Sequence, residues 1–84
     1  MLSDRQKHIL GFVIGYQNYN GFPPSLSEIG AAVGLSSKSS VSYQIGQLEL
    51  MGYVERVGWG PRNLRVLRSV NGNERKQNGT IQFG

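Results

Sequence analysis

Residues 34–52, which read GLSSKSSVSYQIGQLELMG, constrain the fold more than any other part of the chain. Val41, Ile45 and Leu48 lie at i, i+4 and i+7, the spacing that places apolar side chains on one face of a helix. Gly52 suits the end of that helix. The stretch therefore predicts a helix that packs inward through one face and leaves a small, nearly uncharged polar face outside.

The amino end of this predicted helix is rich in hydroxyl groups. Ser36, Ser37 and Lys38 crowd the helix start, where N–H groups without intrahelical partners favour phosphate. Further along, Ser and Tyr hydroxyls suit contacts with base edges. A serine-rich cap on an ordinary structural helix is the alternative interpretation of this stretch taken alone.

Two helices are predicted before it. Ser3 and Gln6 have the spacing of a capping box, and the helix they begin should end near Asn20. Its two glycines, Gly11 and Gly15, are four residues apart, which predicts a face that a neighbouring element approaches closely.

The second predicted helix is short and starts with another capping box, Ser25 with Glu28, directly after two prolines. A glycine-bearing turn at 34–35 joins it to the serine-rich helix, which gives the pattern of a helix-turn-helix. Beyond Gly52, residues 53–57 and 63–68 alternate as strands around the turn GWGP at 58–61, which predicts a β-hairpin packed on the helices.

The expected fold is therefore mainly α with a small β-hairpin: a winged helix-turn-helix of three helices and a two-stranded wing, spanning residues 1–68. Residues 69–84 offer little to bury and are expected to form a flexible tail. With 84 residues the chain fits one small domain.

The composition and net charge of the chain limit the classes of function that it can have. The net charge of +4 favours an anionic partner. The chain has no cysteine and a single histidine, so no metal site or cofactor is expected. Ser3, Asp4 and His8 share one helix start and do not form a catalytic arrangement, and no phosphate-cradling loop occurs, so we expect no enzymatic activity. No apolar run long enough for a membrane span or signal peptide is found, and we expect a cytoplasmic protein.

Several of these segments together resemble the DNA-binding domain of LexA repressors. The resemblance covers roughly residues 2–67 and rests on motifs that occur in the same order without gaps. They are LSDRQ at 2–6, GFPPS at 21–25, EIG at 28–30, VGL at 33–35, SSV at 39–41, LE at 48–49 and GY at 52–53. The resemblance implies a repressor that reads a palindromic operator in the SOS network of a bacterium or phage, with the third helix in the major groove. It also implies that the wing reaches the adjacent backbone or minor groove, and it assigns reading positions to Ser37, Ser39, Ser40, Ser42 and Tyr43.

The residues support a more detailed binding hypothesis. Ser25, Ser37 and Lys38 are expected to hold phosphates, while Ser39, Ser42 and Tyr43 contact base edges, mostly through single or water-mediated hydrogen bonds. Charge near the DNA backbone is expected from the wing arginines, which are Arg56, Arg62 and Arg65.

Two other points stay open at the level of sequence. Trp59 at the wing tip has three interpretations: a wedge against sugar or minor groove, a contact with a partner protein, or a ring folded back on the wing. With an exposed Leu50 it favours an alternative function, a winged-helix module that binds a host repressor or polymerase. LexA repressors continue into a carboxy-terminal domain with a Ser/Lys pair and the dimer contacts, whereas this sequence stops at Gly84. Self-cleavage is therefore not expected, and a homodimer on DNA would need another source of contacts.

Overall fold

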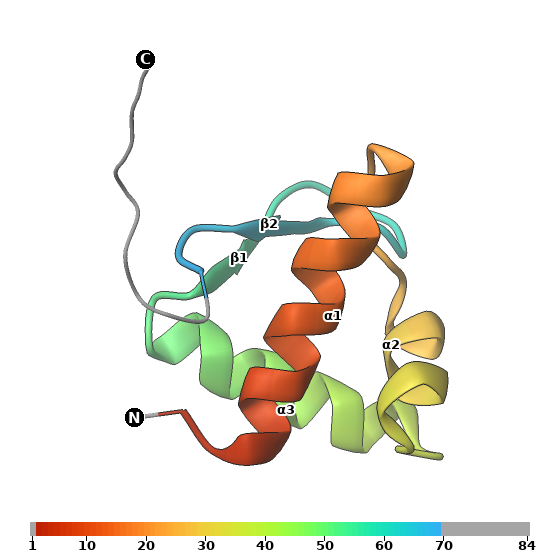
Figure 1. Ribbon diagram of the computed structural model, residues 1–84, viewed down its shortest axis with the longest axis vertical. Coiled ribbons are helices and arrows are strands. Elements are labelled where there is room, and N and C mark those ends of the chain that lie inside the picture. The colour runs from red at the N-terminus through yellow and green to blue at the C-terminus, as the bar shows by residue number, and fades with distance from the viewer. Residues whose placement is uncertain (1, 70–84) are drawn as a thin grey trace.

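A computed structural model describes residues 2–69 of the protein. Its helices and strands follow the order α1 (Asp4–Asn20), α2 (Leu26–Val33), α3 (Lys38–Leu50), β1 (Val54–Arg56) and β2 (Leu64–Val66). Residues 70–84, most of the predicted tail, lie outside the described residues. Figure 1 shows α1 crossing in front of the hairpin and of α3, with α2 beside them.

Both predicted capping boxes are confirmed. The Ser3 hydroxyl accepts from the Gln6 N–H at 3.1 Å while the Gln6 side chain accepts from the Ser3 N–H at 2.9 Å. In the second box the Ser25 hydroxyl accepts from the Glu28 N–H at 3.2 Å, and the Glu28 carboxylate accepts from the Ser25 N–H at 2.8 Å. These reciprocal hydrogen bonds satisfy N–H groups that have no partner inside a helix, so they define where α1 and α2 begin. The left-handed Gly21, with φ 86°, ends α1 where the sequence predicted.

The core forms from the apolar spacing in the sequence. All three helices contribute side chains that are almost completely buried, and each strand adds one. The predicted inward face of α3 is confirmed. The core residues of the helices and strands are Ile9, Leu10, Val13, Ile29, Val33, Val41, Ile45, Leu48, Val54 and Leu64.

The close contact between helices occurs at Gly30 in α2. A Cβ atom there would lie 2.7 Å from the Leu35 carbonyl oxygen and 3.2 Å from Cγ2 of Val41. The prediction of a close approach at Gly11 and Gly15 is wrong, because Gly11 is exposed and a Cβ on Gly15 would meet no atom within 4 Å. Gly30 therefore sets how closely α2 and the turn into α3 pack.

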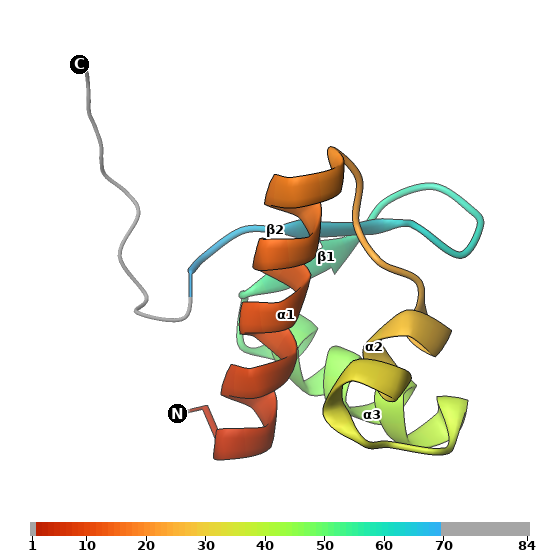
Figure 2. The same cartoon turned by 45° about the vertical axis from the view of Figure 1, so that its right-hand side comes forward.

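The hairpin is antiparallel, with Val54 opposite Val66 and Glu55 opposite Arg65. Its strands are shorter than predicted, and a hydrogen bond of 2.8 Å from the Val57 N–H to the Asn63 carbonyl closes the loop beyond them. Three helices followed by this hairpin make a winged helix-turn-helix, as predicted. In Figure 2 the hairpin loop and the first turn of α3 lie on the same side of the molecule, with α2 between them.

Candidate nucleic-acid interface

The outer face of α3 is small and polar at its start. Ser39, Ser40 and Tyr43 are exposed, and the Tyr43 side chain keeps 64% of its surface accessible. They are displayed because Val41 and Ile45 hold the opposite side of the helix in the core. The predicted reading positions therefore share one exposed surface, apart from Ser42, which is half-buried.

The start of α3 presents donors. Ser37 is the N-cap residue, and its hydroxyl accepts from the Ser39 N–H at 3.1 Å. Unlike α1 and α2, this helix has no capping box. The first backbone hydrogen bond of the helix runs from the Val41 N–H to the Ser37 carbonyl oxygen, at 3.2 Å. The N–H groups of Lys38 and Ser40 therefore remain for an outside acceptor, at the end of the helix where the dipole favours an anion.

A hollow of about 450 Å³ runs along this face of α3. It brings Ser39, Ser40 and Tyr43 together with Arg5 at the start of α1. The Arg5 guanidinium donates to the Val33 carbonyl at 3.2 Å, which holds it beside the turn. No pattern in the sequence marks Arg5 as a site residue, because only the packing of α1 on the helix-turn-helix brings it near α3.

A second hollow, of about 180 Å³, joins the starts of two helices to the wing. It is lined by the N-cap residue Ser25 with Leu26 and Ser27 of α2, by Lys38 of α3 and by Pro61 of the hairpin loop. Ser25 and Lys38, both predicted phosphate contacts, therefore lie close together. The Ser25 hydroxyl oxygen already accepts the capping hydrogen bond from Glu28, so its hydroxyl hydrogen is the part it can offer to a phosphate.

Two of the three wing arginines make ion pairs on the surface of α3 or of the hairpin. Arg56 lies 3.3 Å from the Glu49 carboxylate and donates to the Ser42 hydroxyl at 3.4 Å, which joins two predicted site residues. Arg65 pairs with Glu55, directly opposite it in the hairpin, at 2.9 Å. Exposed pairs of this kind stabilise a protein by about 1 kcal/mol or less, so a phosphate can compete for either cation.

Arg62 is held differently from the other two. Its two terminal nitrogens form a fork on the Glu28 carboxylate, at 2.6 and 2.9 Å. The same side chain donates to the Pro23 carbonyl at 3.1 Å and to the Tyr16 hydroxyl at 3.3 Å. It also lies 4.9 Å from the centre of the Phe22 ring. The structure therefore holds Arg62 against the α1–α2 connection, whereas the sequence alone predicts a side chain that offers its charge to DNA.

The ion pair changes the acidity of Glu28. Hydrogen bonds from Arg62, then from the Ser25 N–H, and to a smaller extent from the Tyr16 hydroxyl, lower the pKa of Glu28 to about 2. The pKa of Arg62 is raised by the same pairing. Both groups therefore stay charged across the neutral and mildly acidic range.

The lowered pKa predicts a pH dependence of stability. Glu28 stabilises the fold above its unfolded-state pKa, near 4.3, and this contribution is lost as the pH falls from there to about 2. In urea unfolding followed by circular dichroism, we expect Glu28→Gln to be less stable than the wild type at pH 7. The two should converge as the pH approaches 2. A stability difference that is the same at both pH values would contradict this assignment.

The wing tip carries Trp59, whose side chain is 100% exposed. Gly58 and Gly60 on either side adopt positive φ angles of 69° and 104°, which allow the tight loop. Of the three interpretations of Trp59, the one in which the ring folds back on the wing is wrong. The exposed ring is available to a ligand outside the protein.

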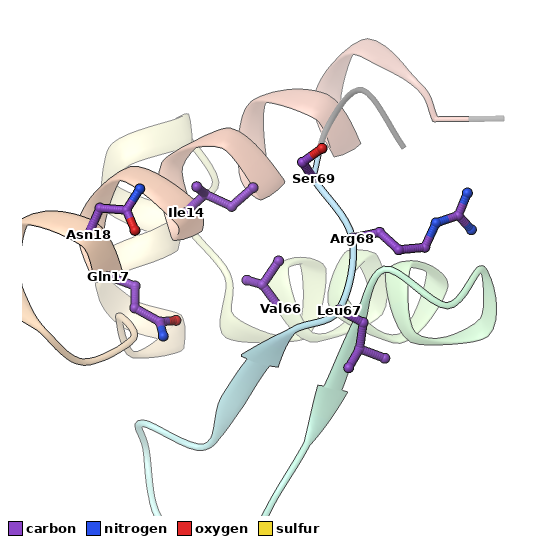
Figure 3. Close-up of a pocket in the computed structure, with 7 residues that line it drawn as sticks. All are labelled: Ile14, Gln17, Asn18, Val66, Leu67, Arg68 and Ser69. Atoms are coloured by element: carbon purple, nitrogen blue, oxygen red, sulfur yellow. The ribbon is translucent and has the colours of Figure 1, made fainter. Parts of the chain in front are cut away.

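A hollow on another part of the surface is separate from these residues. It measures about 260 Å³ and lies between the second half of α1 and the end of β2. Figure 3 shows Val66 and Ile14 facing each other across it, whereas Arg68 points away. None of the predicted site residues lines it.

Two further features concern only the part of the chain that the structure describes. Residues 2–69 contain no helix long and apolar enough to cross a membrane. Over the same range no group of three or more His, Cys, Asp or Glu side chains is arranged to hold a metal ion.

Comparison with known proteins places this chain in a family. The family model described as "LexA DNA binding domain" matches residues 1–63. A LexA repressor of Pseudarthrobacter chlorophenolicus is 50% identical over 66 residues, which cover 79% of this chain and 26% of that protein. A LexA repressor of Clavibacter sepedonicus is 46% identical over 78 residues, covering 93% of this chain and 34% of the relative.

A third relative, the LexA repressor of Thermobifida fusca, is 40% identical over 82 residues, which cover 95% of this chain and 32% of that protein. The chain thus spans only about a quarter to a third of the length of the curated relatives it matches. The matched region contains all three helices, β1 and the hairpin loop, and it ends directly before β2. The chain belongs to the LexA DNA-binding domain family.

Proposed function

We propose that this domain binds double-stranded DNA sequence-specifically as the operator-reading part of a transcriptional repressor. The observation that carries the proposal is the arrangement at α3, where exposed Ser39, Ser40 and Tyr43 line one hollow and N–H donors are offered at the helix start. The start of α3 lies on the same side of the molecule as the hairpin loop (Figure 2). A helix with small polar side chains fits closely into a major groove. The protein acts by binding, and no catalytic step is part of the proposal.

In this mechanism the start of α3 sets the register on the DNA. Lys38, Ser37 and the hydroxyl of Ser25 would hold phosphates, and Ser39, Ser40, Ser42 and Tyr43 would face base edges. None of these side chains offers the bidentate readout of arginine on guanine, so single and water-mediated hydrogen bonds carry the sequence preference. Two copies on the two halves of a palindromic operator would add their contacts.

The wing would extend the interface beyond the major groove. Trp59 would lie against the sugar or minor groove, where apolar side chains make contact without reading a hydrogen-bond pattern. Arg56 and Arg65 would supply charge to the adjacent backbone.

The proposal is tested by anisotropy titrations of a palindromic SOS-type operator and a scrambled duplex at several salt concentrations. We expect the operator to bind at least about tenfold tighter, because base contacts add to the phosphate contacts. If Arg5, Lys38, Arg56 and Arg65 neutralise about four phosphates, the log–log salt slope on a half-site should be near −3.6. Equal, salt-sensitive binding to both duplexes would contradict sequence reading, and no binding at low salt would contradict the whole proposal.

A second function, a protein-interaction module for a host repressor or polymerase, is favoured by two exposed apolar side chains. Leu50 keeps 82% of its surface accessible at the end of α3, and Trp59 is fully exposed. The two functions separate cleanly by mutation. Loss of operator binding on changing Ser39 and Tyr43 indicates DNA, whereas an effect only on changing Leu50 and Trp59 indicates a protein partner.

A further inference from the structure

We infer that Arg62 is a positioning residue that clamps the wing to the helices, and that it is not a phosphate contact. This inference rests on the proposed function, because the wing it positions is taken to contact DNA. The clamp is the cluster of Arg62 with Glu28, Tyr16, Phe22 and the carbonyl of Pro23. It holds the loop that carries Trp59 at a defined place relative to the start of α2, and through α2 relative to α3.

Both terminal nitrogens of Arg62 are already engaged in the free protein. One terminal nitrogen has three acceptors, on Glu28, Pro23 and Tyr16, at 2.6 to 3.3 Å. The other donates to the second Glu28 oxygen at 2.9 Å. The faces of the guanidinium are engaged too, since its central carbon lies 4.9 Å from the ring centre of Phe22 and 5.9 Å from that of Tyr16. A phosphate would have to displace these contacts to bind Arg62 directly.

Glu28 is equally committed on the other side of the pair. Besides Arg62, its oxygens accept from the Ser25 N–H at 2.8 Å and from the Tyr16 hydroxyl at 3.1 Å. The carboxylate is thus anchored to α2 by its own capping box and to α1 by Tyr16. Arg62 therefore attaches the wing to a point that two helices hold rigidly.

The rest of the loop has no comparable attachment. Among the described residues, Arg62 makes every hydrogen bond that joins loop residues 58–62 to the helices. The Arg65–Glu55 pair lies within the hairpin and moves with it. Two glycines with positive φ in the loop make a free wing tip flexible. Fixing such a loop before binding reduces the entropy that is lost when it is ordered on DNA.

The test uses two variants that break the fork while changing little else. Glu28→Gln removes the charge but keeps a side chain able to complete the capping box. Arg62→Lys keeps the positive charge but cannot form the two-pronged pair. Glu55→Gln is the matched control, because it makes the same charge change as Glu28→Gln in an exposed wing pair outside the clamp. Circular dichroism should show all three folded at pH 7, since none of the three side chains belongs to the buried core, although Glu28→Gln is expected to be less stable than the wild type.

The first readout needs no DNA. Trp59 is the only tryptophan in the chain, so time-resolved fluorescence anisotropy reports on the wing tip. We expect a larger amplitude of fast depolarisation in Glu28→Gln and Arg62→Lys than in the wild type or Glu55→Gln. Unchanged Trp59 motion in both clamp variants would overturn the inference, whatever the protein binds.

The second readout is the affinity for the operator. The clamp predicts that Glu28→Gln and Arg62→Lys bind about three- to tenfold more weakly than the wild type, with an unchanged salt slope. Glu28→Gln should do so although it gains net positive charge, whereas Glu55→Gln, with the same charge change, should bind at least as tightly as the wild type. A direct phosphate contact predicts the reverse for Glu28→Gln, because the freed Arg62 would bind at least as tightly. It also predicts that Arg62→Ala reduces the magnitude of the log–log salt slope of DNA binding by about 0.9. Either of those results would overturn the inference. A wild type without operator preference would instead overturn the proposed function and leave the Trp59 measurement as the test of the clamp.

Discussion

Replacing Ser39 and Tyr43 together with alanine is expected to reduce the preference for operator over scrambled DNA by about 30-fold. Each side chain supplies one contact to base edges in the proposed complex, and two such contacts at about 1 kcal/mol each give a factor of this size. Both side chains are exposed and line the same hollow on α3, so truncation removes contacts with DNA without opening the core. Competitive anisotropy titrations with the two duplexes measure the ratio directly.

The control for this prediction is Tyr19→Ala. Tyr19 is 90% exposed near the end of α1, so it matches Tyr43 in chemistry and accessibility but is not on α3. It should leave the operator preference unchanged. Binding to scrambled DNA should change little in the double variant, because Lys38 and the arginines stay in place. A double variant that keeps the full preference would show that α3 is not the reading element.

Gly30→Val is expected to destabilise the domain by about 3 kcal/mol. The first atom of the new side chain would meet the Leu35 carbonyl oxygen at 2.7 Å, and that oxygen belongs to the backbone of the turn. Relieving the contact requires α2 and the turn to move apart, which also disturbs Val41 in the core. A domain of this size has a total stability of about 5 kcal/mol, so such a loss would leave about 2 kcal/mol and raise the unfolded fraction from about 0.02% to about 3%.

Gly15→Val provides the matched comparison. It introduces the same side chain into a helix, but at an exposed position where no atom lies within 4 Å of the new Cβ. Since valine is a slightly better helix former than glycine, this variant should be as stable as the wild type or a little more stable. Urea unfolding followed by circular dichroism at pH 7 measures the free energy of unfolding of both variants. Equal stability of the two variants would show that the contact at Gly30 relaxes without cost.

Much of the fold was predictable because its signals are local. Ser3 with Gln6 and Ser25 with Glu28 mark helix starts through hydrogen bonds that span three residues. Val41, Ile45 and Leu48 mark the buried face of α3 through helical spacing alone. The polar face of α3 follows from the same spacing, so the exposed positions of Ser39, Ser40 and Tyr43 were also predictable.

Other features depend on contacts between distant parts of the chain. Gly11 and Gly15 looked like the close-approach glycines from their spacing, yet Gly30 has that role, because the turn at Leu35 folds back over it. Arg5 lies beside the outer face of α3 only because α1 packs on the helix-turn-helix. No local pattern in the sequence predicts the contact at Gly30 or the position of Arg5 beside α3.

The sequence by itself determined the order and limits of the helices, the position of the hairpin and the chemical character of α3, since hydrogen bonding and hydrophobic periodicity act over a few residues. Only the tertiary structure decided which partners the wing arginines have. Arg62 and Glu28 are 34 residues apart, and their pairing requires the hairpin to return to the start of α2. An arginine in a basic wing has the same local sequence whether it is free or clamped, because its partner is selected by packing.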